Sequence, residues 1–363
     1  MRKILLLVVL LLIGYVIFSL LKGKTETQVK NLGGNKIEET FNNESEDKTG
    51  ITISSKSIFV PYWTVVDLSS DQLDSYDRVI YFGVAAVEEG IDRSESGYSA
   101  LPVFIQNTEG KKRLLTLRML DTESNLKILS DSKLQEKIVN DLIGIIDEYG
   151  FDGAVLDLEL SVLPFGDVKE NVSMFVRTLG EKLHERDLDF AMTIYGDTYF
   201  RGRPYDIRNL SDYVDEFMIM AYDFHKSYGE PGPNFPLDGR KTYGYDFKKM
   251  IEDFSADVEP EKLTVVFGMF GYDWTLGKQG KPLKRGEART LNEIRERFYP
   301  ECGLKDCLIK KDPESAGTEI AYVDDEGYGH VVWFDDEPSV EKKLEYLKSK
   351  GIGSAAYWAW GYY

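Results

Sequence analysis

The sequence predicts an eight-stranded (β/α) barrel, preceded by a transmembrane anchor and a polar linker. Short apolar segments alternate with amphipathic segments from residue 57 to residue 363, which is the pattern of βαβ units in a parallel sheet. Eight of the apolar segments have the length of strands, the number that closes a barrel of this kind. An uncharged apolar run near the N-terminus predicts the anchor.

The composition favours a folded domain that does not bind polyanions. Acidic residues outnumber basic residues 62 to 44, which gives a formal net charge of -18. Such a charge repels nucleic acid, whereas a neutral sugar chain carries no comparable penalty. Hydrophobic residues make up 42% of the chain, enough to build a core. We therefore expect no nucleic-acid partner.

Residues 1–22 are predicted to form an uncleaved signal anchor. The run 4–21 has no charged residue, and its length of about 18 residues approaches what spans a bilayer. A cleaved signal has a shorter apolar region and a small-residue cleavage site, so secretion after cleavage is the alternative. Residues 23–56 are polar and predict a disordered linker. We therefore expect the domain to lie outside the cytoplasm and to be attached to the membrane only by this N-terminal anchor.

Eight candidate strands and several amphipathic helices fill the segment 57–363. The strands are expected at 58–63, 79–87, 113–119, 153–159, 189–195, 216–223, 263–270 and 354–358. Residues 133–149 and 168–185 have apolar positions at helical spacing and predict members of an outer layer. The alternation fails between about 272 and 336. A helix-like stretch at 290–298 and alternating segments at 319–323 and 330–334 predict a small α+β insertion after strand seven.

The two cysteines and the three histidines give few constraints. Cys302 and Cys307 are close in sequence, and both a short-loop disulfide and two free thiols stay open. His184, His225 and His330 are scattered and lack the spacing of metal ligands. We expect neither a metal nor an organic cofactor.

The predicted strand at 153–159 brings two carboxylates to one face. The lumen face would have Gly153, Val155, Asp157 and Glu159, and the helix face Ala154, Leu156, Leu158 and Leu160. Asp157 and Glu159 would then lie roughly 7 Å apart at the end of the strand where barrel enzymes have their active sites. Two such carboxylates do not easily both ionise, so one should hold a proton. A glutamic acid with a raised pKa can protonate a leaving oxygen. The alternative is a solvated pair at a strand end.

Residues 152–159 resemble the signature D-x-x-D-x-D-x-E of glycoside hydrolase family 18. Asp152 matches its first position, Asp157 its third aspartate and Glu159 its catalytic acid. Val155 stands where the family has the middle aspartate, which there shares charge and proton with the next one. The departure bears on activity, but it leaves the acid in place.

Two further segments carry the same resemblance in the expected order. Residues 220–223 (MAYD) resemble the M-x-Y-D element at the end of strand six, whose tyrosine and aspartate, here Tyr222 and Asp223 beside Met220, hold the acetamido group. Residues 351–360 resemble the last strand, whose tryptophan, here Trp358, lies under the sugar. Residues from 271 onward are similar to the insertion and final helix of members that include spore-cortex-lytic and chitinase-like enzymes.

Some positions allow other interpretations or depart from the family. Tyr222 and Trp358 could simply fill the barrel, and Asp223 could cap a helix after its strand. Tyr62, Trp63 and Tyr195 lie at other predicted strand ends, and we expect them to contact sugar. In the third strand Arg118 and Met119 replace the glycines of the S-x-G-G found in typical chitinases, which weakens the case for chitin.

The resemblance implies hydrolysis of a β-linked N-acetylglucosamine-containing polysaccharide, either peptidoglycan or a chitin-like glycan, by a monomer. In a substrate-assisted retaining mechanism, Glu159 would protonate the glycosidic oxygen while the substrate's acetamido oxygen attacks the anomeric carbon. Asp157 would orient the acetamido group and Tyr222 would hydrogen-bond its oxygen. The alternative, motivated by Val155, is a lectin-like barrel that binds carbohydrate with weak or no catalysis.

Overall fold

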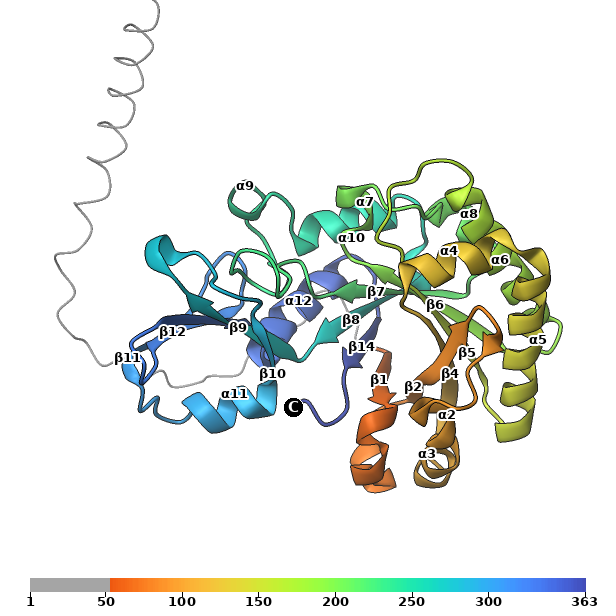
Figure 1. Ribbon diagram of the computed structural model, residues 1–363, viewed down its shortest axis with the longest axis horizontal. Coiled ribbons are helices and arrows are strands. Elements are labelled where there is room, and N and C mark those ends of the chain that lie inside the picture. Colours follow the sequence, from red (N-terminus) through yellow and green to blue (C-terminus); the bar gives the residue numbers. More distant parts are fainter. Residues whose placement is uncertain (1–52) are drawn as a thin grey trace, which may run out of the picture. The chain divides into compact units, whose positions relative to one another are not determined.

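The computed structural model describes residues 53–363, and its central feature is a closed barrel of parallel strands (Figure 1). The predicted anchor and most of the predicted linker lie outside the described residues. Within the described part of the chain, no helix has the length and apolar character needed to cross a bilayer.

Eight strands form the barrel, as the sequence predicts. They are β1 (Ser55–Pro61), β2 (Arg78–Val87), β4 (Lys112–Met119), β5 (Gly153–Leu158), β6 (Asp189–Tyr195), β7 (Glu216–Ala221), β8 (Leu263–Gly268) and β14 (Ser354–Trp358). Neighbouring strands in the order β1-β14-β8-β7-β6-β5-β4-β2 are parallel, and β1 also pairs with β2. That last pairing closes the sheet. The short β3 (Gly90–Ile91) pairs antiparallel with the end of β2.

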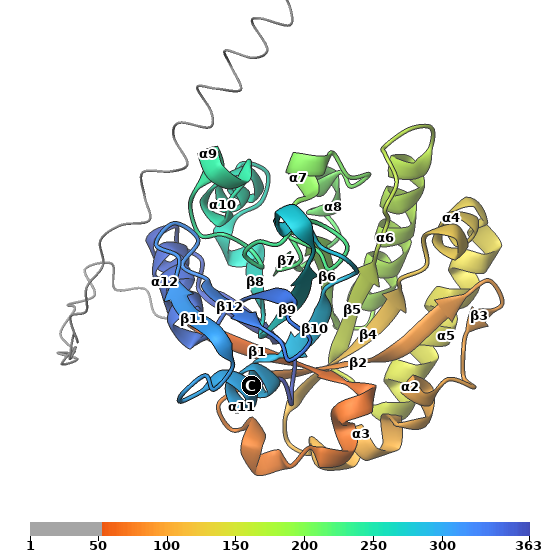
Figure 2. The ribbon, with the colours of Figure 1, turned by 60° about the vertical axis from the view of Figure 1, so that its left-hand side comes forward.

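The longer helices lie outside the strands (Figure 2). They are α4 (Thr122–Ser130), α5 (Ser132–Tyr149), α6 (Val168–His184), α10 (Phe247–Ser255) and α12 (Glu337–Ser349). Shorter helical turns are α2 (Ser96–Ser99), α3 (Leu101–Asn107), α7 (Thr198–Arg201), α8 (Ile207–Leu210), α9 (Arg240–Tyr243), η1 (Tyr62–Asp67), η2 (Ser70–Leu73), η3 (Pro260–Lys262) and η4 (Lys278–Gly280). In α5 the Asp131 side chain accepts hydrogen bonds from the first-turn N–H groups, and Gly150 ends the helix with a left-handed φ of 68°.

Two separate apolar layers follow from the alternation of side chains along the strands. A small cluster fills the lumen, with Phe59, Ile80, Phe82, Leu114, Val155, Ala191, Met218, Val266 and Ala356. On β5, Val155 belongs to this lumen cluster, whereas Ala154, Leu156 and Leu158 belong to the larger core between strands and helices. The alternation predicted for this strand is therefore confirmed, and it directs Asp157 into the lumen.

A second sheet is inserted between β8 and α12. It is antiparallel, in the order β10-β9-β13-β12-β11, with β9 (Phe270–Leu276), β10 (Glu287–Thr290), β11 (Lys305–Lys311), β12 (Thr318–Val323) and β13 (Gly329–Phe334). Helix α11 (Leu291–Phe298) starts at Thr290, which forms a capping box with Glu293. A disulfide bond joins Cys302 and Cys307 in the stretch from α11 into β11. Of the two alternatives that the sequence left open, the structure therefore has the disulfide and not two free thiols.

Candidate active site

Strand β5 is fixed to both neighbours by Asp152, which precedes it, and by its first residue, Gly153. Asp152 Oδ2 accepts a hydrogen bond of 2.7 Å from the backbone N–H of Arg113 at the start of β4. A Cβ at Gly153 would lie 2.2 Å from the backbone oxygen of Asp189, so only glycine allows β6 to approach this closely. These contacts fix the register in which Asp157 lies opposite Arg118 of β4.

Asp157 is a buried carboxyl group, only 4% exposed. The Thr193 hydroxyl donates a hydrogen bond to its Oδ1. Burial, and after it the charge of Glu159, raises the pKa of Asp157 from 3.8 to about 7, although Thr193 and Arg118 act in the opposite direction. We expected one carboxyl group of the pair to hold a proton, and the structure gives the raised pKa to Asp157.

Glu159 lies just beyond the end of β5, where its backbone N–H binds the Met119 oxygen at 2.8 Å. Its Oε2 accepts a hydrogen bond of 2.6 Å from the Tyr195 hydroxyl. Burial and the nearby Glu159 charge hold the pKa of Tyr195 far above its usual range, so this phenol stays a donor. The Arg203 guanidinium lies 3.7 Å from the centre of the Tyr195 ring. Glu159 is therefore held in one orientation by a neutral hydrogen-bond donor.

A cavity of about 490 Å³ opens over these carboxylates at the carboxyl ends of the barrel strands. Its lining includes seven residues that the sequence singled out: Trp63, Asp157, Glu159, Met220, Tyr222, Asp223 and Trp358. Half of the surface of Trp63 is exposed. Tyr62 and Tyr195 do not line it. Tyr62 packs edge-on against Trp63 and lies under the Arg118 guanidinium. Tyr195 reaches the site through Glu159.

Tyr222 and Asp223 follow β7 and line this cavity. Burial, and then the charge of Asp157, raises the pKa of Tyr222 well above its usual value, so its hydroxyl stays protonated. The hydroxyl of Tyr272 donates a 2.7 Å hydrogen bond to Asp223 Oδ1. The next helix, α9, begins only at Arg240, so the alternative in which Asp223 caps a helix is wrong.

Trp358 at the end of β14 connects the cavity to the lumen cluster. Its ring packs against Phe82 at 4.7 Å and Phe59 at 5.7 Å between centroids, and it lies 6.4 Å from Trp63. The residue thus fills the barrel and also presents a surface to the cavity. Its role in filling the barrel is therefore confirmed, whereas its position under a sugar stays a prediction.

Several cavity residues were not found from the sequence. Thr193 could have been predicted from the sequence, because it precedes Tyr195 by two positions and therefore lies on the same lumen face of β6. Tyr272, Arg289 and Thr290 come from the inserted sheet and the start of α11, and Tyr362 comes from the C-terminal tail. No periodic pattern predicts that these segments reach the barrel mouth.

Comparison with known proteins identifies the family. Residues 120–362 match the model for glycosyl hydrolases family 18, which is more than half of the chain. The chain belongs to this family, as the resemblance of residues 152–159 predicted.

The relatives are distant and longer. A cortical fragment-lytic enzyme of Bacillus anthracis is 25% identical over 239 residues, which are 64% of this chain and 52% of the relative. Chitinase C of Streptomyces lividans is 27% identical over 161 residues, 42% of this chain and 25% of that enzyme. The chain spans about half the length of the cortical fragment-lytic enzyme it matches.

Solved structures share the fold. The spore cortex-lytic enzyme SleL of Bacillus cereus superposes with a TM-score of 0.69 at 20% identity, over 86% of this chain and 72% of that one. A chitinase from Trichuris suis has a TM-score of 0.72 at 18% identity, over 85% and 92%. At these identities the likeness concerns the fold alone.

Proposed function

We propose that this protein hydrolyses β-linked N-acetylglucosamine-containing glycans by a substrate-assisted mechanism that retains the anomeric configuration. One observation carries the proposal: Glu159 and the buried Asp157 share a cavity with Tyr222, Asp223 and Trp358. The cavity has the groups that such a reaction needs, namely a proton donor, a carboxyl partner, a phenol donor and an aromatic surface.

In the first step, the one proton that Asp157 and Glu159 share lies on Glu159, which gives it to the glycosidic oxygen, and the bond from that oxygen to the anomeric carbon breaks. The carbonyl oxygen of the substrate's own acetamido group forms a bond to the anomeric carbon from the opposite face. Asp157 accepts the hydrogen bond of the acetamido N–H and stabilises the positive charge that develops there. The Tyr222 hydroxyl donates to the acetamido oxygen and positions it for attack.

In the second step, the Glu159 carboxylate removes a proton from a water molecule, whose oxygen attacks the anomeric carbon. The ring formed with the acetamido group opens, and the two inversions together retain the configuration. Tyr195 holds Glu159 in position throughout. Trp358 supplies an apolar surface for the sugar ring.

Val155 bears directly on this mechanism. It is fully buried in the lumen cluster, two residues before Asp157 on the same face of β5. Asp157 therefore has the Thr193 hydroxyl as its hydrogen-bond partner where the family has a second carboxyl group. The raised pKa of Asp157 supports a pair with Glu159 that still shares one proton near neutral pH.

Val155 also favours the second candidate function, carbohydrate binding without turnover. Two kinds of assay distinguish hydrolysis from binding without turnover. The first measures release of the chromophore from a chromogenic chitobioside and of reducing ends from purified peptidoglycan. The second is a glycan-binding titration. We expect turnover by the wild type, loss of turnover with retained binding for Glu159→Gln, and full activity for Glu148→Gln on the exposed face of α5. Binding without product at every pH would establish the lectin. Undiminished hydrolysis by Glu159→Gln would overturn the role of Glu159.

We further propose that the barrel acts outside the cytoplasm, tethered by residues 1–22. Envelope glycan is then the substrate that it meets first. Protease added to intact cells should degrade the barrel, and the full chain should sediment with membranes. Full protection from the protease would contradict this placement.

A further inference from the structure

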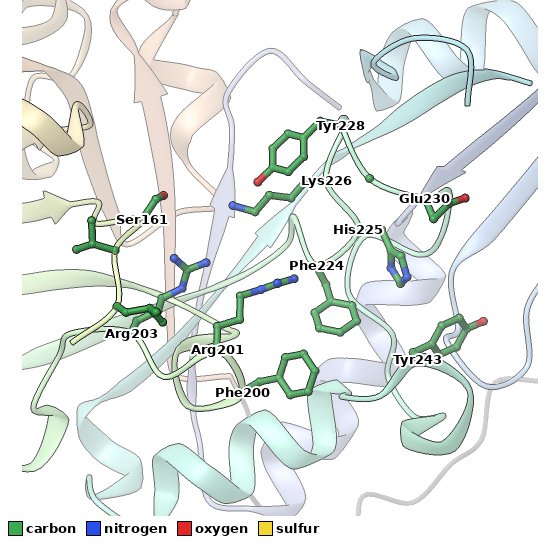
Figure 3. A pocket seen from close by; sticks show the side chains of 13 residues that line it. Ser161, Phe200, Arg201, Arg203, Phe224, His225, Lys226, Tyr228, Glu230 and Tyr243 are labelled. Atoms are coloured by element: carbon green, nitrogen blue, oxygen red, sulfur yellow. The ribbon is translucent and has the colours of Figure 1, made fainter. Parts of the chain in front are cut away.

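A second cavity, of about 610 Å³, lies at the carboxyl ends of the barrel strands and is shown in Figure 3. The loops after β5, β6 and β7 form it. Ser161 lies on the loop that begins with Glu159, so the two cavities share one loop. The proposed mechanism uses none of the side chains that line this second cavity.

The lining of the second cavity is cationic, although the chain has a formal net charge of -18. Arg201, Arg203 and Lys226 contribute three positive side chains, and Glu230 is the one acidic residue among those that line it. Figure 3 shows the Lys226 ammonium group, the Tyr228 hydroxyl and the two guanidinium groups turned toward the same space. A local excess of cations in an acidic protein favours an anionic ligand.

The buried Asp197, which is not among the lining residues, holds the two arginines in place. Its carboxylate is buried and accepts a hydrogen bond from the Nε of Arg201 and, at 2.7 Å, from the Nε of Arg203. Each arginine is therefore fixed through Nε. Nη1 of Arg203 also donates to the Leu160 backbone oxygen at 3.4 Å, so Arg201, whose side chain is 47% exposed, offers its terminal nitrogens to a ligand more openly than Arg203. Guanidinium groups held in this way match the planar geometry of a carboxylate.

Lys226 adds a third positive charge. It forms no ion pair within residues 53–363, but its charge partly offsets the burial that raises the pKa of Asp223. Its ammonium group lies 5.2 Å from the centre of the Tyr195 ring, on which Arg203 also stacks. The hydroxyl of that same tyrosine binds Glu159. The cationic groups are thus one aromatic ring away from the proposed acid.

We propose that the second cavity binds a carboxylate substituent of the glycan, on a sugar next to the bond that is cleaved. The inference rests on the proposed function and narrows its substrate class to acidic glycans. Two arginines and a lysine recognise the carboxylate, and the rings of Phe200 and Phe224, 5.9 Å apart, offer an apolar surface to the sugar that carries it. A chitin chain has no anionic group for these cations, whereas the N-acetylmuramic acid of peptidoglycan has a lactyl carboxyl group, which is a free carboxylate where no stem peptide is attached.

Binding to a variant that does not turn over tests this inference. In the Glu159→Gln background, calorimetry would compare a tetrasaccharide of alternating N-acetylglucosamine and N-acetylmuramic acid with the same tetrasaccharide converted to primary amides. We expect the acid to bind on the order of tenfold more tightly than the amide, as for one charge-assisted hydrogen bond. Lys226→Met and Arg201→Met should each remove most of that ratio. Lys241→Met, which removes an exposed lysine outside the cavity lining, should preserve it.

The possible outcomes separate this inference from the proposed function. Equal affinities for acid and amide, no binding of either, or a ratio that Lys226→Met and Arg201→Met leave intact would overturn the carboxylate site. Hydrolysis by the wild type is measured separately on the acid and the amide tetrasaccharide. An affinity ratio between acid and amide without hydrolysis would support the carboxylate site and refute catalysis. Hydrolysis without that affinity ratio would support catalysis and refute the carboxylate site.

Discussion

Asp157→Asn removes a buried carboxyl group. The free energy needed to bury that group depends on pH, because its ionised form is harder to bury than its protonated form. The pKa of this group in the folded protein is raised from 3.8 to about 7. Its contribution to stability is therefore fully present below pH 3.8 and is lost as the pH rises through about 7. Asparagine has nearly the same shape and does not titrate. The variant should consequently gain stability relative to the wild type as the pH rises.

The size of the gain follows from the shift in pKa. A shift of roughly three pKa units at about 1.36 kcal/mol per unit amounts to about 4 kcal/mol. The free energy of unfolding of Asp157→Asn, minus that of the wild type, should thus increase by about 4 kcal/mol between pH 4 and pH 8. Other groups titrate in both proteins, so most of their contributions cancel in the difference.

Urea titrations followed by tryptophan fluorescence at several pH values measure this difference. Glu159→Gln is the matched control, because it removes the second cause of the shift and leaves burial, the largest one. When both proteins also have Glu159→Gln, the difference in free energy of unfolding between Asp157→Asn and Asp157 should depend less on pH, but the dependence should not disappear. A difference that stays constant from pH 4 to pH 8 would refute the buried, proton-holding Asp157.

Three further predictions concern activity. Because Asp157 and Glu159 share one proton, kcat/KM on a chromogenic chitobioside should fall as the pH rises through an apparent pKa near 7, which is set chiefly by the burial of Asp157. A value of kcat/KM that stays flat to pH 9 would contradict this. Tyr195→Phe removes the hydrogen bond to Glu159 and should lower kcat about tenfold or more with little change in KM, and a pure KM effect would show direct sugar contact instead. Trp358→Ala should raise KM by up to about tenfold through the lost aromatic surface, and an unchanged KM in a folded variant would exclude that contact.

The barrel and its two carboxylates could be predicted because they follow from local patterns. Period-two alternation directs Val155 and Asp157 to one face of β5, and the structure has that alternation. All eight strand positions are likewise visible as apolar segments between amphipathic ones. These features need only the alternation of side chains and the length of the elements.

Features that depend on tertiary contacts could not be predicted. The alternation puts Tyr195 at a strand end, but it does not reveal that its hydroxyl turns to Glu159. Tyr272 reaches Asp223 from the inserted sheet, which no periodicity connects to the barrel mouth. The raised pKa of Asp157 depends first on burial, a property of the assembled barrel. The cationic cavity combines three loops, so its charges are scattered in the sequence.

Proton donation by Glu159 is tested most directly by varying the leaving group. A dinitrophenyl chitobioside has a leaving group that needs no proton, whereas a sugar leaving group needs one. For first-turnover cleavage by Glu159→Gln relative to wild type, we predict a loss on the order of 10²–10⁴-fold with the sugar leaving group and a much smaller loss with dinitrophenol. Equal losses for both leaving groups would contradict the assignment of the proton to Glu159.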